Sequence, residues 1–363
     1  MLTRKLTNLQ RKFLLVTIAC LAAIVFTPLT SLAQPPAPKP CFDFTGTGRT
    51  SFATISANQP AGSMNWNILS NGGDNSVQTY AFGFSSIEFG DGFAPGYYDG
   101  DNRADAAVTR LSGFGNGDLT FYIRPSTQIV GNPSAFYGVR WGTFPDLPRI
   151  GDYDGDGRTD LTVVRRDAGT LVWFILRSQT NTFNAIRFGL DSDLAVPGAD
   201  YNGDGRDEVT VIRTYPNPQV RSSTYFAGDS NTGDLVLAQD WGSNSDVYVI
   251  GDYLGDRRAD FAVMRRRDSS TPLVNAIWYI LENGGSASFV ARQFGYGESG
   301  GIPDIPVCGD YNGDGKQDIA VYRRSNRAFY WLNSPDYNSF SSQEWGQPNM
   351  INSPIGSLYT RSR

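Results

Sequence analysis

The sequence of 363 residues predicts an all-β protein, a β-propeller of about six four-stranded blades. Three observations lead to this prediction: a nine-residue acidic motif recurs six times, two strand patterns follow each copy, and an aromatic-glycine pair closes each unit. Successive motifs begin 54, 55, 48, 52 and 58 residues apart. Repeats of roughly this length with four short strands are typical of propeller blades, which bury their faces against one another.

The acidic motif concentrates negative charge in short windows, whose positions are numbered 1 to 9 below. Its copies are DFTGTGRTS (43–51), YYDGDNRAD (97–105), DYDGDGRTD (152–160), DYNGDGRDE (200–208), DYLGDRRAD (252–260) and DYNGDGKQD (310–318). These windows contain 18 of the 36 acidic residues in 54 positions, more than ordinary turn chemistry produces. Several carboxylates so close together repel one another unless a cation or water lies among them.

Two strand patterns follow every motif. The first alternates apolar and polar residues, as in DLTVVRR (160–166), and this period is typical of a strand with one buried face. The second is aromatic-rich: WNIL (66–69), FYIR (121–124), WFIL (173–176), YFAG (225–228), WYIL (278–281) and FYWL (329–332). We interpret these aromatic residues as packing between neighbouring blades and not as a stacking platform for a ligand.

An aromatic-glycine pair closes each unit, and a short apolar strand then leads into the next motif. The pairs are Phe89-Gly90, Trp141-Gly142, Phe188-Gly189, Trp241-Gly242, Phe294-Gly295 and Trp345-Gly346. A last fragment, SPIGSLY (353–359), is similar to the short apolar strand but lacks an acidic motif after it. We expect this fragment to close the ring beside the first blade, while a seventh blade built jointly by the two termini stays open.

The first 33 residues have the layout of a secretory signal peptide. Four basic residues precede a mostly apolar run from Phe13 to Phe26, and Ser31-Leu32-Ala33 offers small residues for cleavage. A single membrane anchor over this run is the alternative. We expect cleavage of residues 1–33, a short proline-rich linker at 34–40 and the propeller at 41–363. The mature protein is then secreted, extracellular or periplasmic, without a membrane span.

The charge and composition exclude several classes of function. Removing the four basic residues of the leader changes the net charge from −5 to −9, which argues against nucleic acid or anionic lipid as a partner. The chain has no histidine, so it lacks the commonest general base and cannot form the usual Ser-His-Asp triad. We expect a monomer whose partner is an extracellular glycan or protein.

Two cysteines remain after the leader, and each lies two residues before position 1 of a motif. Cys41 and Cys308 occupy equivalent places in the first and last units, which become neighbours when a ring closes. A disulfide is compatible with an oxidising compartment. Two buried thiols too far apart to bond are the alternative, because a disulfide requires Cα atoms within about 7 Å. Both remain open.

The complete motifs have the ligand pattern of a calcium loop. Calcium takes six to eight oxygen ligands, which such loops supply from alternate side chains, one backbone carbonyl and a later carboxylate. Three motifs supply the whole set: Asp152, Asp154, Asp156, the Arg158 carbonyl and Asp160; Asp200, Asn202, Asp204, the Arg206 carbonyl and Glu208; and Asp310, Asn312, Asp314, the Lys316 carbonyl and Asp318. Glycines between the acids allow the backbone to turn around an ion. Magnesium prefers rigid octahedral sites that keep water, which favours calcium.

Two further motifs are weaker candidates. They keep three carboxylates each: Asp99, Asp101 and Asp105 in the second, and Asp252, Asp256 and Asp260 in the fifth. Tyr97 replaces the first ligand of the second motif, while Leu254 and Arg257 interrupt the fifth. We expect about three strong calcium sites and at most five, with the first motif a bare turn. Asp-Gly turns without an ion are the alternative, but they do not account for the carboxylate clusters.

Acidic loops joined to aromatic-glycine pairs, as in FGDGFAPGYYDGD and FGLDSDLAVPGADYNGDG, resemble FG-GAP/VCBS repeats. Such repeats build integrin α-like propellers and occur in many secreted bacterial proteins, and the resemblance covers nearly all of residues 41–359. It implies calcium loops on one face that support the fold, with ligands often bound elsewhere. It implies no single activity, since the repeats occur in adhesion proteins, lectin-like modules and some polysaccharide lyases.

The residues and the resemblance together predict a binding protein. We expect a secreted calcium-binding propeller, with calcium structural, that acts as a binding or adhesion module for a glycan or cell-surface protein. The alternative is an extracellular carbohydrate-active enzyme similar to a polysaccharide lyase, although no catalytic set of residues stands out. Recognition is expected in the loops that differ most in length between units, such as 212–222 and 295–304.

Overall fold

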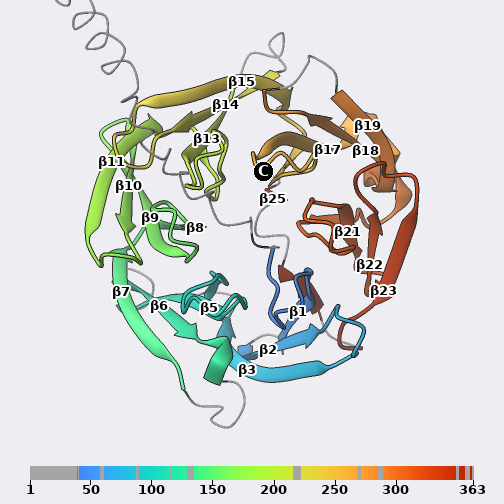
Figure 1. The fold of residues 1–363 in the computed structure, drawn as a ribbon, viewed down its shortest axis with the longest axis horizontal. Coiled ribbons are helices and arrows are strands. Elements are labelled where there is room, and N and C mark those ends of the chain that lie inside the picture. Colours follow the sequence, from blue (N-terminus) through green and yellow to red (C-terminus); the bar gives the residue numbers. More distant parts are fainter. Residues whose placement is uncertain are drawn as a thin grey trace, which may run out of the picture. The chain divides into compact units, whose positions relative to one another are not determined.

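The computed structural model describes residue 39 and residues 41–57, 61–86, 90–113, 117–128, 135–215, 222–268, 271–284, 289–348, 351–355 and 360–361. All of these belong to one compact unit, Pro36–Arg363. Within it, six antiparallel sheets are arranged as the blades of a ring (Figure 1). The predicted signal peptide, and the predicted linker except Lys39, lie outside the described residues.

Four strands recur in every blade and are counted here from the axis outward, leaving aside one short extra strand of the fifth blade (Figure 1). The innermost are β24 (Ile351–Pro354), β4 (Gly92–Phe93), β8 (Leu147–Gly151), β12 (Leu194–Ala195), β16 (Val247–Gly251) and β20 (Ile305–Val307). The second are β1 (Phe52–Ala57), β5 (Ala106–Leu111), β9 (Asp160–Asp167), β13 (Val209–Thr214), β17 (Asp260–Asp268) and β21 (Ile319–Arg323). The third are β2 (Ala61–Leu69), β6 (Asp118–Arg124), β10 (Thr170–Leu176), β14 (Ser222–Gly228), β18 (Thr271–Leu281) and β22 (Ala328–Leu332). The outermost are β3 (Val77–Ser86), β7 (Tyr137–Thr143), β11 (Phe183–Leu190), β15 (Leu235–Ser243), β19 (Phe289–Tyr296) and β23 (Phe340–Glu344).

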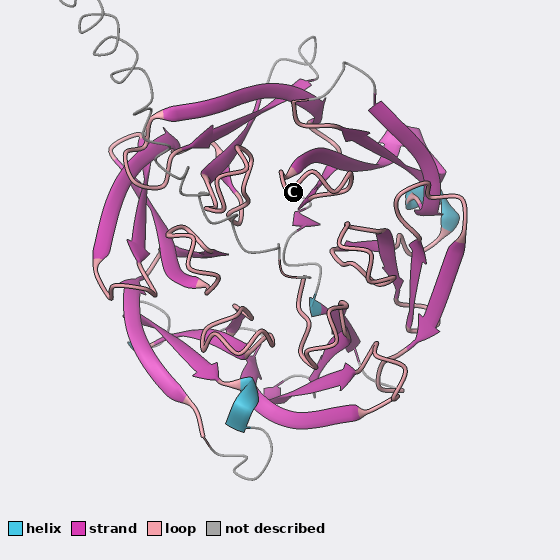
Figure 2. Ribbon diagram, in the orientation of Figure 1, coloured by secondary structure: helices cyan, strands magenta, loops and turns pink. Residues whose placement is uncertain are grey.

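Strands and loops make up almost all of the described unit (Figure 2). Short 3₁₀ turns occur at Ser126–Gln128 and Glu298–Gly300. Among the described residues, no helix combines the length and the apolar character that a bilayer crossing requires. The predicted all-β class is confirmed, and both predicted strand patterns fall on the second and third strands of the blades.

The C-terminal segment closes the ring. Strand β24 pairs with β1 in antiparallel register, with Ser353 opposite Ile55, so the first blade is built from both ends of the chain. A further strand, β25 (Thr360–Arg361), pairs with β16 and gives the fifth blade a fifth strand. The fragment SPIGSLY therefore completes blade one, as far as it is described, and the ring has six blades.

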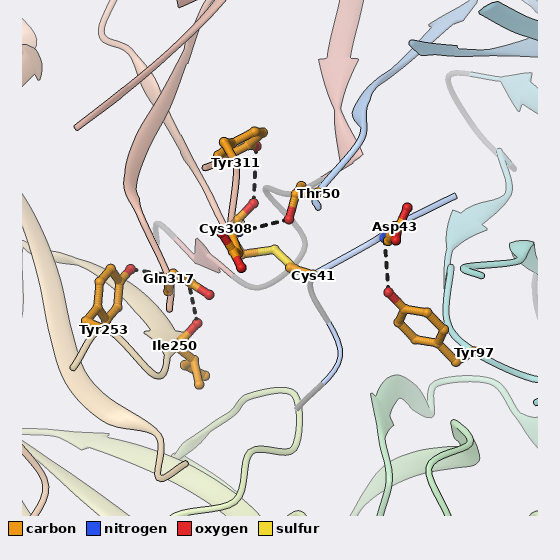
Figure 3. The surroundings of a disulfide bond; sticks show 10 residues. Cys41, Asp43, Thr50, Tyr97, Ile250, Tyr253, Cys308, Tyr311 and Gln317 are labelled. Carbon is orange, nitrogen blue, oxygen red and sulfur yellow. Dashed lines mark hydrogen bonds between the residues drawn. A yellow bond between two sulfur atoms is a disulfide. The ribbon is translucent and has the colours of Figure 1, made fainter. Parts of the chain in front are cut away.

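A disulfide joins the first and last blades beside this closure. Cys41 and Cys308 are bonded, with their Cα atoms 6.0 Å apart, which decides between the two alternatives left by the sequence (Figure 3). The same two blades are joined next to the disulfide by Thr50 and Asp310. The Thr50 amide donates to the Asp310 carbonyl at 2.8 Å, and the Asp310 amide donates to Thr50 Oγ1 at 2.9 Å.

The hydrophobic core lies between the blades, because a four-stranded sheet buries both faces only when it stacks on a neighbour. Each cluster of buried apolar side chains spans adjacent blades. Three half-buried indoles also bond across a seam: Trp141, Trp241 and Trp345 donate to the carbonyls of Phe174, Tyr279 and Asn67. This confirms the interpretation of the aromatic residues as packing between blades.

One aromatic-glycine pair was assigned wrongly. In the later blades the glycine has a left-handed backbone, as at Gly189 (φ 93°), and the Phe188 carbonyl accepts from the Trp173 indole. In the first blade the equivalent pair is Phe82-Gly83, since Gly83 has φ 96° and the Phe82 carbonyl accepts from the Trp66 indole. Strand β3 continues past Phe82-Gly83 to Ser86, so this pair lies farther from the next motif than in blades two, three and four. The spacing therefore favoured Phe89-Gly90, and Phe89 lies outside the described residues.

An ion pair between a buried aspartate side chain and a partly exposed arginine recurs in five blades, and the sequence analysis did not predict it. The pairs are Asp91–Arg110, Asp146–Arg165, Asp193–Arg213, Asp246–Arg265 and Asp304–Arg323. Asp246 directly precedes the innermost strand of its blade, β16. Its carboxylate accepts two hydrogen bonds of 2.8 Å from Arg265 and one from the Ser243 amide. The Arg265 guanidinium lies over the Tyr279 ring at 4.8 Å. The sequence does contain a feature that could have predicted these pairs: an arginine lies five residues after position 9 in each of the five motifs.

Removing the arginine from one such pair leaves a buried carboxylate without its cation. We expect Arg265→Ala to lower the free energy of unfolding by about 3–5 kcal/mol, because the Asp246 side chain is fully buried. The control is Arg140→Ala, whose partner Asp118 is half-exposed and whose loss costs at most about 1 kcal/mol. Urea unfolding measures both, and equal losses would contradict the role given to the pair.

The disulfide should stabilise the closed ring. We expect Cys41→Ser with Cys308→Ser to lower the free energy of unfolding by about 2–5 kcal/mol, because the unfolded chain loses a constraint over a separation of 267 residues. Reduction of the unmodified protein should give the same loss in urea unfolding. A reductant that destabilises the double variant equally would show that the effect comes from elsewhere.

Candidate metal centres and the axial cavity

In blades two to six the acidic motif forms the loop between the innermost and second strands, at the inner side of the blade, and in blade one it directly precedes the second strand, β1 (Figure 2). The backbone is left-handed at position 4 and again at position 6 in all six loops. In the third loop these are Gly155 (φ 78°) and Gly157 (φ 81°). Position 6 is Asn102 in the second loop and Arg257 in the fifth, both with positive φ. Glycine adopts this conformation without strain, which explains its recurrence.

The carboxylates at positions 1 and 9 hold the loop in shape. In the third loop, Asp152 accepts hydrogen bonds of 2.7 Å from the Gly155 and Gly157 amides. Asp160 accepts from the Tyr153 amide within the loop and from the Ser178 amide after the third strand. The position-1 bonds recur in every loop that begins with aspartate, including the first.

The loops are also bonded to one another in a closed ring. In each blade the position-8 amide donates to the position-1 carbonyl of the preceding blade. The bonds are Thr50–Asp310, Ala104–Asp43, Thr159–Tyr97, Asp207–Asp152, Ala259–Asp200 and Gln317–Asp252, with lengths of 2.7–2.8 Å. Some position-8 side chains add a second bond: Asp207 Oδ2 accepts from the Asp152 amide at 2.7 Å. Spacing alone did not reveal this ring.

Three loops bring carboxylate oxygens within 4.8 Å of one another. The groups are Asp99, Asp101 and Asp105 in the second loop, Asp152, Asp154 and Asp156 in the third, and Asp200, Asp204 and Glu208 in the fourth. Two of them belong to motifs predicted as complete sites, and one to a motif predicted as weak. In the fourth group the longer side chain of Glu208 reaches the other acids from position 9.

Among the described residues, the fifth and sixth loops do not gather three carboxylates so closely. In the sixth loop position 9 is Asp318, one methylene shorter than Glu208, and the Ser334 and Tyr311 amides hold it at 2.7 and 2.8 Å. Asn312 donates instead to the Ser334 carbonyl and hydroxyl, both at 3.1 Å. Position 9 of the fifth loop, Asp260, is held in the same way by the Tyr253 and Asn283 amides.

Burial and mutual repulsion raise the pKa values of several carboxyl groups in these loops. Burial, with repulsion from neighbouring carboxylates, raises the pKa of Asp105 and of Asp160 to about 7 and that of Glu208 to about 8. The pKa of Asp152 is raised to about 6 for the same reasons, although backbone amides partly oppose the shift. These loops therefore concentrate negative charge where ionisation is unfavourable without a cation.

The donors of these loops are compatible with a hard divalent cation. They are carboxylate and amide oxygens, with hydroxyls such as Ser178 Oγ beside them, and such cations take oxygen ligands. The described ion pair within the third loop is Arg158 Nε to Asp156 Oδ2 at 4.0 Å, which neutralises little of the charge. A ligand role for the Arg158, Arg206 and Lys316 carbonyls stays a prediction.

Two residues that depart from the motif make contacts with neighbouring parts of the propeller. Tyr97, at position 1 of the second loop, accepts a hydrogen bond from the Asp43 amide through its hydroxyl (Figure 3). Its ring also lies 4.7 Å from Lys39 Nζ, which donates to the Gly157 carbonyl. Leu254, at position 3 of the fifth loop, packs against the cluster shared by blades five and six. Both substitutions replace a possible ligand with a contact between blades.

Position 7 is basic in all six loops, and we call these residues the basic ring: Arg49, Arg103, Arg158, Arg206, Arg258 and Lys316. Each side chain lies over the position-4 glycine of the preceding blade. A Cβ atom on Gly203 would lie 3.1 Å from Arg258 Nε, and one on Gly255 would lie 2.5 Å from Lys316 Cε. Position 4 therefore needs glycine for space as well as for backbone conformation.

A cavity of about 520 Å³ opens among the loops around the axis. Its wall includes three members of the basic ring, Arg158, Arg258 and Lys316, together with Lys39. Position-1 residues and the glycines of the loops form much of the remaining wall. Burial lowers the pKa of Lys39, although the nearby carboxylates oppose this shift.

These features define a class of protein, a six-bladed β-propeller with an acidic loop at the inner side of each blade. Residues 252–321, which contain the fifth and sixth motifs, match the model of the FG-GAP-like repeat. This match covers two of the six motifs and confirms the predicted resemblance to FG-GAP repeats there, and the fold is the β-propeller that the resemblance implies. No curated protein sequence matches the chain.

Two solved structures are similar in part. The β-propeller domain of the Trilobed protease from Pyrococcus furiosus is 13% identical, with 72% of this chain and 70% of that chain covered and a TM-score of 0.34. The rhamnogalacturonan lyase YesW is 11% identical, with 79% of this chain and 58% of that chain covered and a TM-score of 0.22. Similarity at this level transfers no activity to this chain.

The raised pKa values give the metal-free protein a characteristic pH dependence. A carboxyl group whose pKa is higher in the folded state favours folding at low pH, and this advantage is lost as pH rises through the folded pKa. Because the chain has no histidine, the acids with pKa values of about 6 to 8 dominate this range.

We therefore expect the free energy of unfolding in EDTA to fall as pH rises from about 5 to 8, by up to about 1.4 kcal/mol per pH unit for each ionising group, and the melting temperature to fall with it. Differential scanning calorimetry measures the trend. Asp160→Asn should flatten it, because one of the titrating groups is gone. A melting temperature that is constant or rises over this range would contradict the assignment.

Proposed function

We propose that the protein is a secreted β-propeller, stabilised by calcium, that acts as a binding or adhesion module for an extracellular glycan or cell-surface protein. The observation that carries the calcium part is the gathering of mostly half-buried carboxylates on three loops, with oxygens within 4.8 Å of one another. Export is supported by the leader-like N-terminal sequence and by the Cys41–Cys308 disulfide, which is compatible with an oxidising compartment.

Calcium in these loops is structural in this proposal. The candidate ligands share residues with the hydrogen-bonded ring of loops, so an ion that stabilises one loop also stabilises its contacts with both neighbours. Extracellular calcium modules typically bind at ~0.1 to 1 mM. A site of ~0.1 mM in ~1 mM calcium contributes about 1.4 kcal/mol, and three such sites contribute about 4 kcal/mol. That is a large fraction of the stability of a typical domain.

The axial cavity supports the binding part of the proposal. Its volume of about 520 Å³ lies in the range of ~300–1,000 Å³ that small-ligand sites occupy. Of the loops expected to recognise a partner, 212–222 is described only in part, while 295–304 carries Ile302, which is 63% exposed. An exposed apolar side chain of this size is available for contact with a partner.

A carbohydrate-active enzyme similar to a polysaccharide lyase is the second candidate. Lys39 favours it, because burial lowers the pKa of this amine beside the Tyr97 ring, and a less basic lysine is a better general base at neutral pH. Incubation with acidic polysaccharides separates the two candidates. New unsaturated chain ends would establish the enzyme, and retention of intact polysaccharide would support the binding module.

Calcium should raise the thermal stability of EDTA-treated protein more than magnesium does, since the loops offer many flexible oxygen donors. Asp154→Asn with Asp156→Asn should reduce this increase and also raise the melting temperature in EDTA, because repulsion within the third loop is relieved. Differential scanning calorimetry in EDTA, calcium and magnesium measures all three states.

The matched control is Asp118→Asn with Asp167→Asn, which removes two half-exposed carboxylates on other strands. This control should keep the full calcium response. A protein that calcium does not stabilise, or whose response survives the loss of Asp154 and Asp156, would overturn the calcium assignment for the third loop.

A further inference from the structure

We propose that the axial cavity binds an acidic saccharide unit, whose carboxylate or sulfate group contacts Arg158, Arg258 and Lys316 of the basic ring. The inference rests on the proposed function as a binding module and names the ligand class and the site. Arg158 belongs to blade three, Arg258 to blade five and Lys316 to blade six, yet all three side chains line one cavity.

The calcium role of the loops does not explain the basic ring. A calcium loop uses the backbone carbonyl of position 7, and any residue supplies a carbonyl. All six loops nevertheless carry arginine or lysine there. Within the described residues, the ion pair found for this ring is the 4.0 Å contact of Arg158 with Asp156 of its own loop. The cationic ends of Arg258 and Lys316 therefore have hydrogen-bonding capacity for a ligand.

The basic side chains are positioned before any ligand arrives. The stem of Lys316 lies over Gly255 and that of Arg258 over Gly203, each on the loop of the preceding blade. Aliphatic stems held against a surface leave the charged end toward solvent. Less conformational freedom is then lost when an anion binds, which favours affinity.

The carboxylates around the cavity are already engaged. Asp200 accepts from the Gly203 and Gly205 amides at 2.6 and 2.8 Å, and Asp310 accepts from Gly313 and Gly315 at 2.5 and 2.8 Å. Their oxygens accept from amides of their own loops, whereas within the described residues no ion pair is found for Arg258 or Lys316. Calcium in the loops would reduce the negative charge beside the cavity and so strengthen anion binding.

The rest of the wall fits a sugar better than a bare anion or a long polyanion. Tyr97, Ile250 and Ala259 add apolar surface on which the C–H face of a pyranose ring can pack. The mature protein is acidic overall, so an extended polyanion leaving the cavity would meet repulsive surface. A short acidic unit, such as the end of a uronic-acid or sulfated chain, is small enough to lie beside the basic side chains. The aspartates of the wall, such as Asp200 and Asp310, have their oxygens on loop amides.

The test is isothermal titration calorimetry of the full-length protein in millimolar calcium. The probes are trigalacturonate, a sulfated disaccharide and a neutral galactose trimer, and a short single-stranded DNA is a fourth arm. We expect binding of at least one acidic saccharide, weakened by added salt, and no binding of the neutral trimer. The two acidic arms tell a carboxylate preference from a sulfate preference.

Arg258→Gln with Lys316→Gln should weaken binding of the acidic saccharide by about 10-fold or more, since hydrogen bonds to charged groups are lost. The control with the same change in charge is Arg140→Gln with Arg187→Gln, on outer strands β7 and β11, and it should bind normally. Unchanged melting temperatures would show that both variants are folded.

Several results would overturn the inference. They are absence of binding by either acidic saccharide, equal binding by the Arg258 and Lys316 variant, equal binding of the neutral trimer, or tighter binding of DNA. A protein that calcium stabilises but that binds only neutral glycan would refute this site and leave the proposed function standing. A protein that calcium does not stabilise would refute the calcium part of that function, whatever the cavity binds.

Discussion

The propeller depends on one repeated interaction, the hydrogen bond from the position-8 amide of each acidic loop to the position-1 carbonyl of the loop before it. Apolar packing between blades is strong but has no direction, so by itself it does not fix the rotation of one sheet against the next. A short, directed bond at the inner side of every seam does fix it. Since the last bond joins Thr50 to Asp310, the series has no free end.

The charge of the loops is a consequence of this arrangement. Position 1 uses its carbonyl for the neighbouring blade and, when it is aspartate, its carboxylate for the glycine amides of its own loop, as Asp152 does. Six such loops around one axis bring many acids close together, and burial then opposes their ionisation. The basic residues at position 7 lie close enough to offset part of this repulsion, and a cation bound as proposed would offset more of it. Under that proposal, fold stability and ligand recognition depend on the same few loops.

The repeat made much of this fold predictable from sequence. Fixed spacing, alternating strands and aromatic residues in register defined the blades, and equivalent positions brought Cys41 and Cys308 together as one of two alternatives. Contacts between units were not predictable, because a repeat describes each unit and not its neighbour. The course of Arg258 over Gly203 and the pairing of Arg265 with Asp246 depend on the rotation of one blade against the next. The motif also did not predict where three acids meet: among the described loops, the second gathers its acids with Asp105 at position 9, while the sixth, with Asp318 there, does not.

The first blade has a particular consequence for biosynthesis. Its innermost strand, β24, comes from the C-terminal end of the chain, so a nascent chain carries a three-stranded first blade until residues 351–354 have been made. Throughout that time the inner edge of β1 presents unpaired backbone groups, and such edges pair readily with strands of other chains. Ribosome pausing before residues 351–354 would prolong this exposed state, whereas blades two, three, four and six can complete their sheets as they emerge.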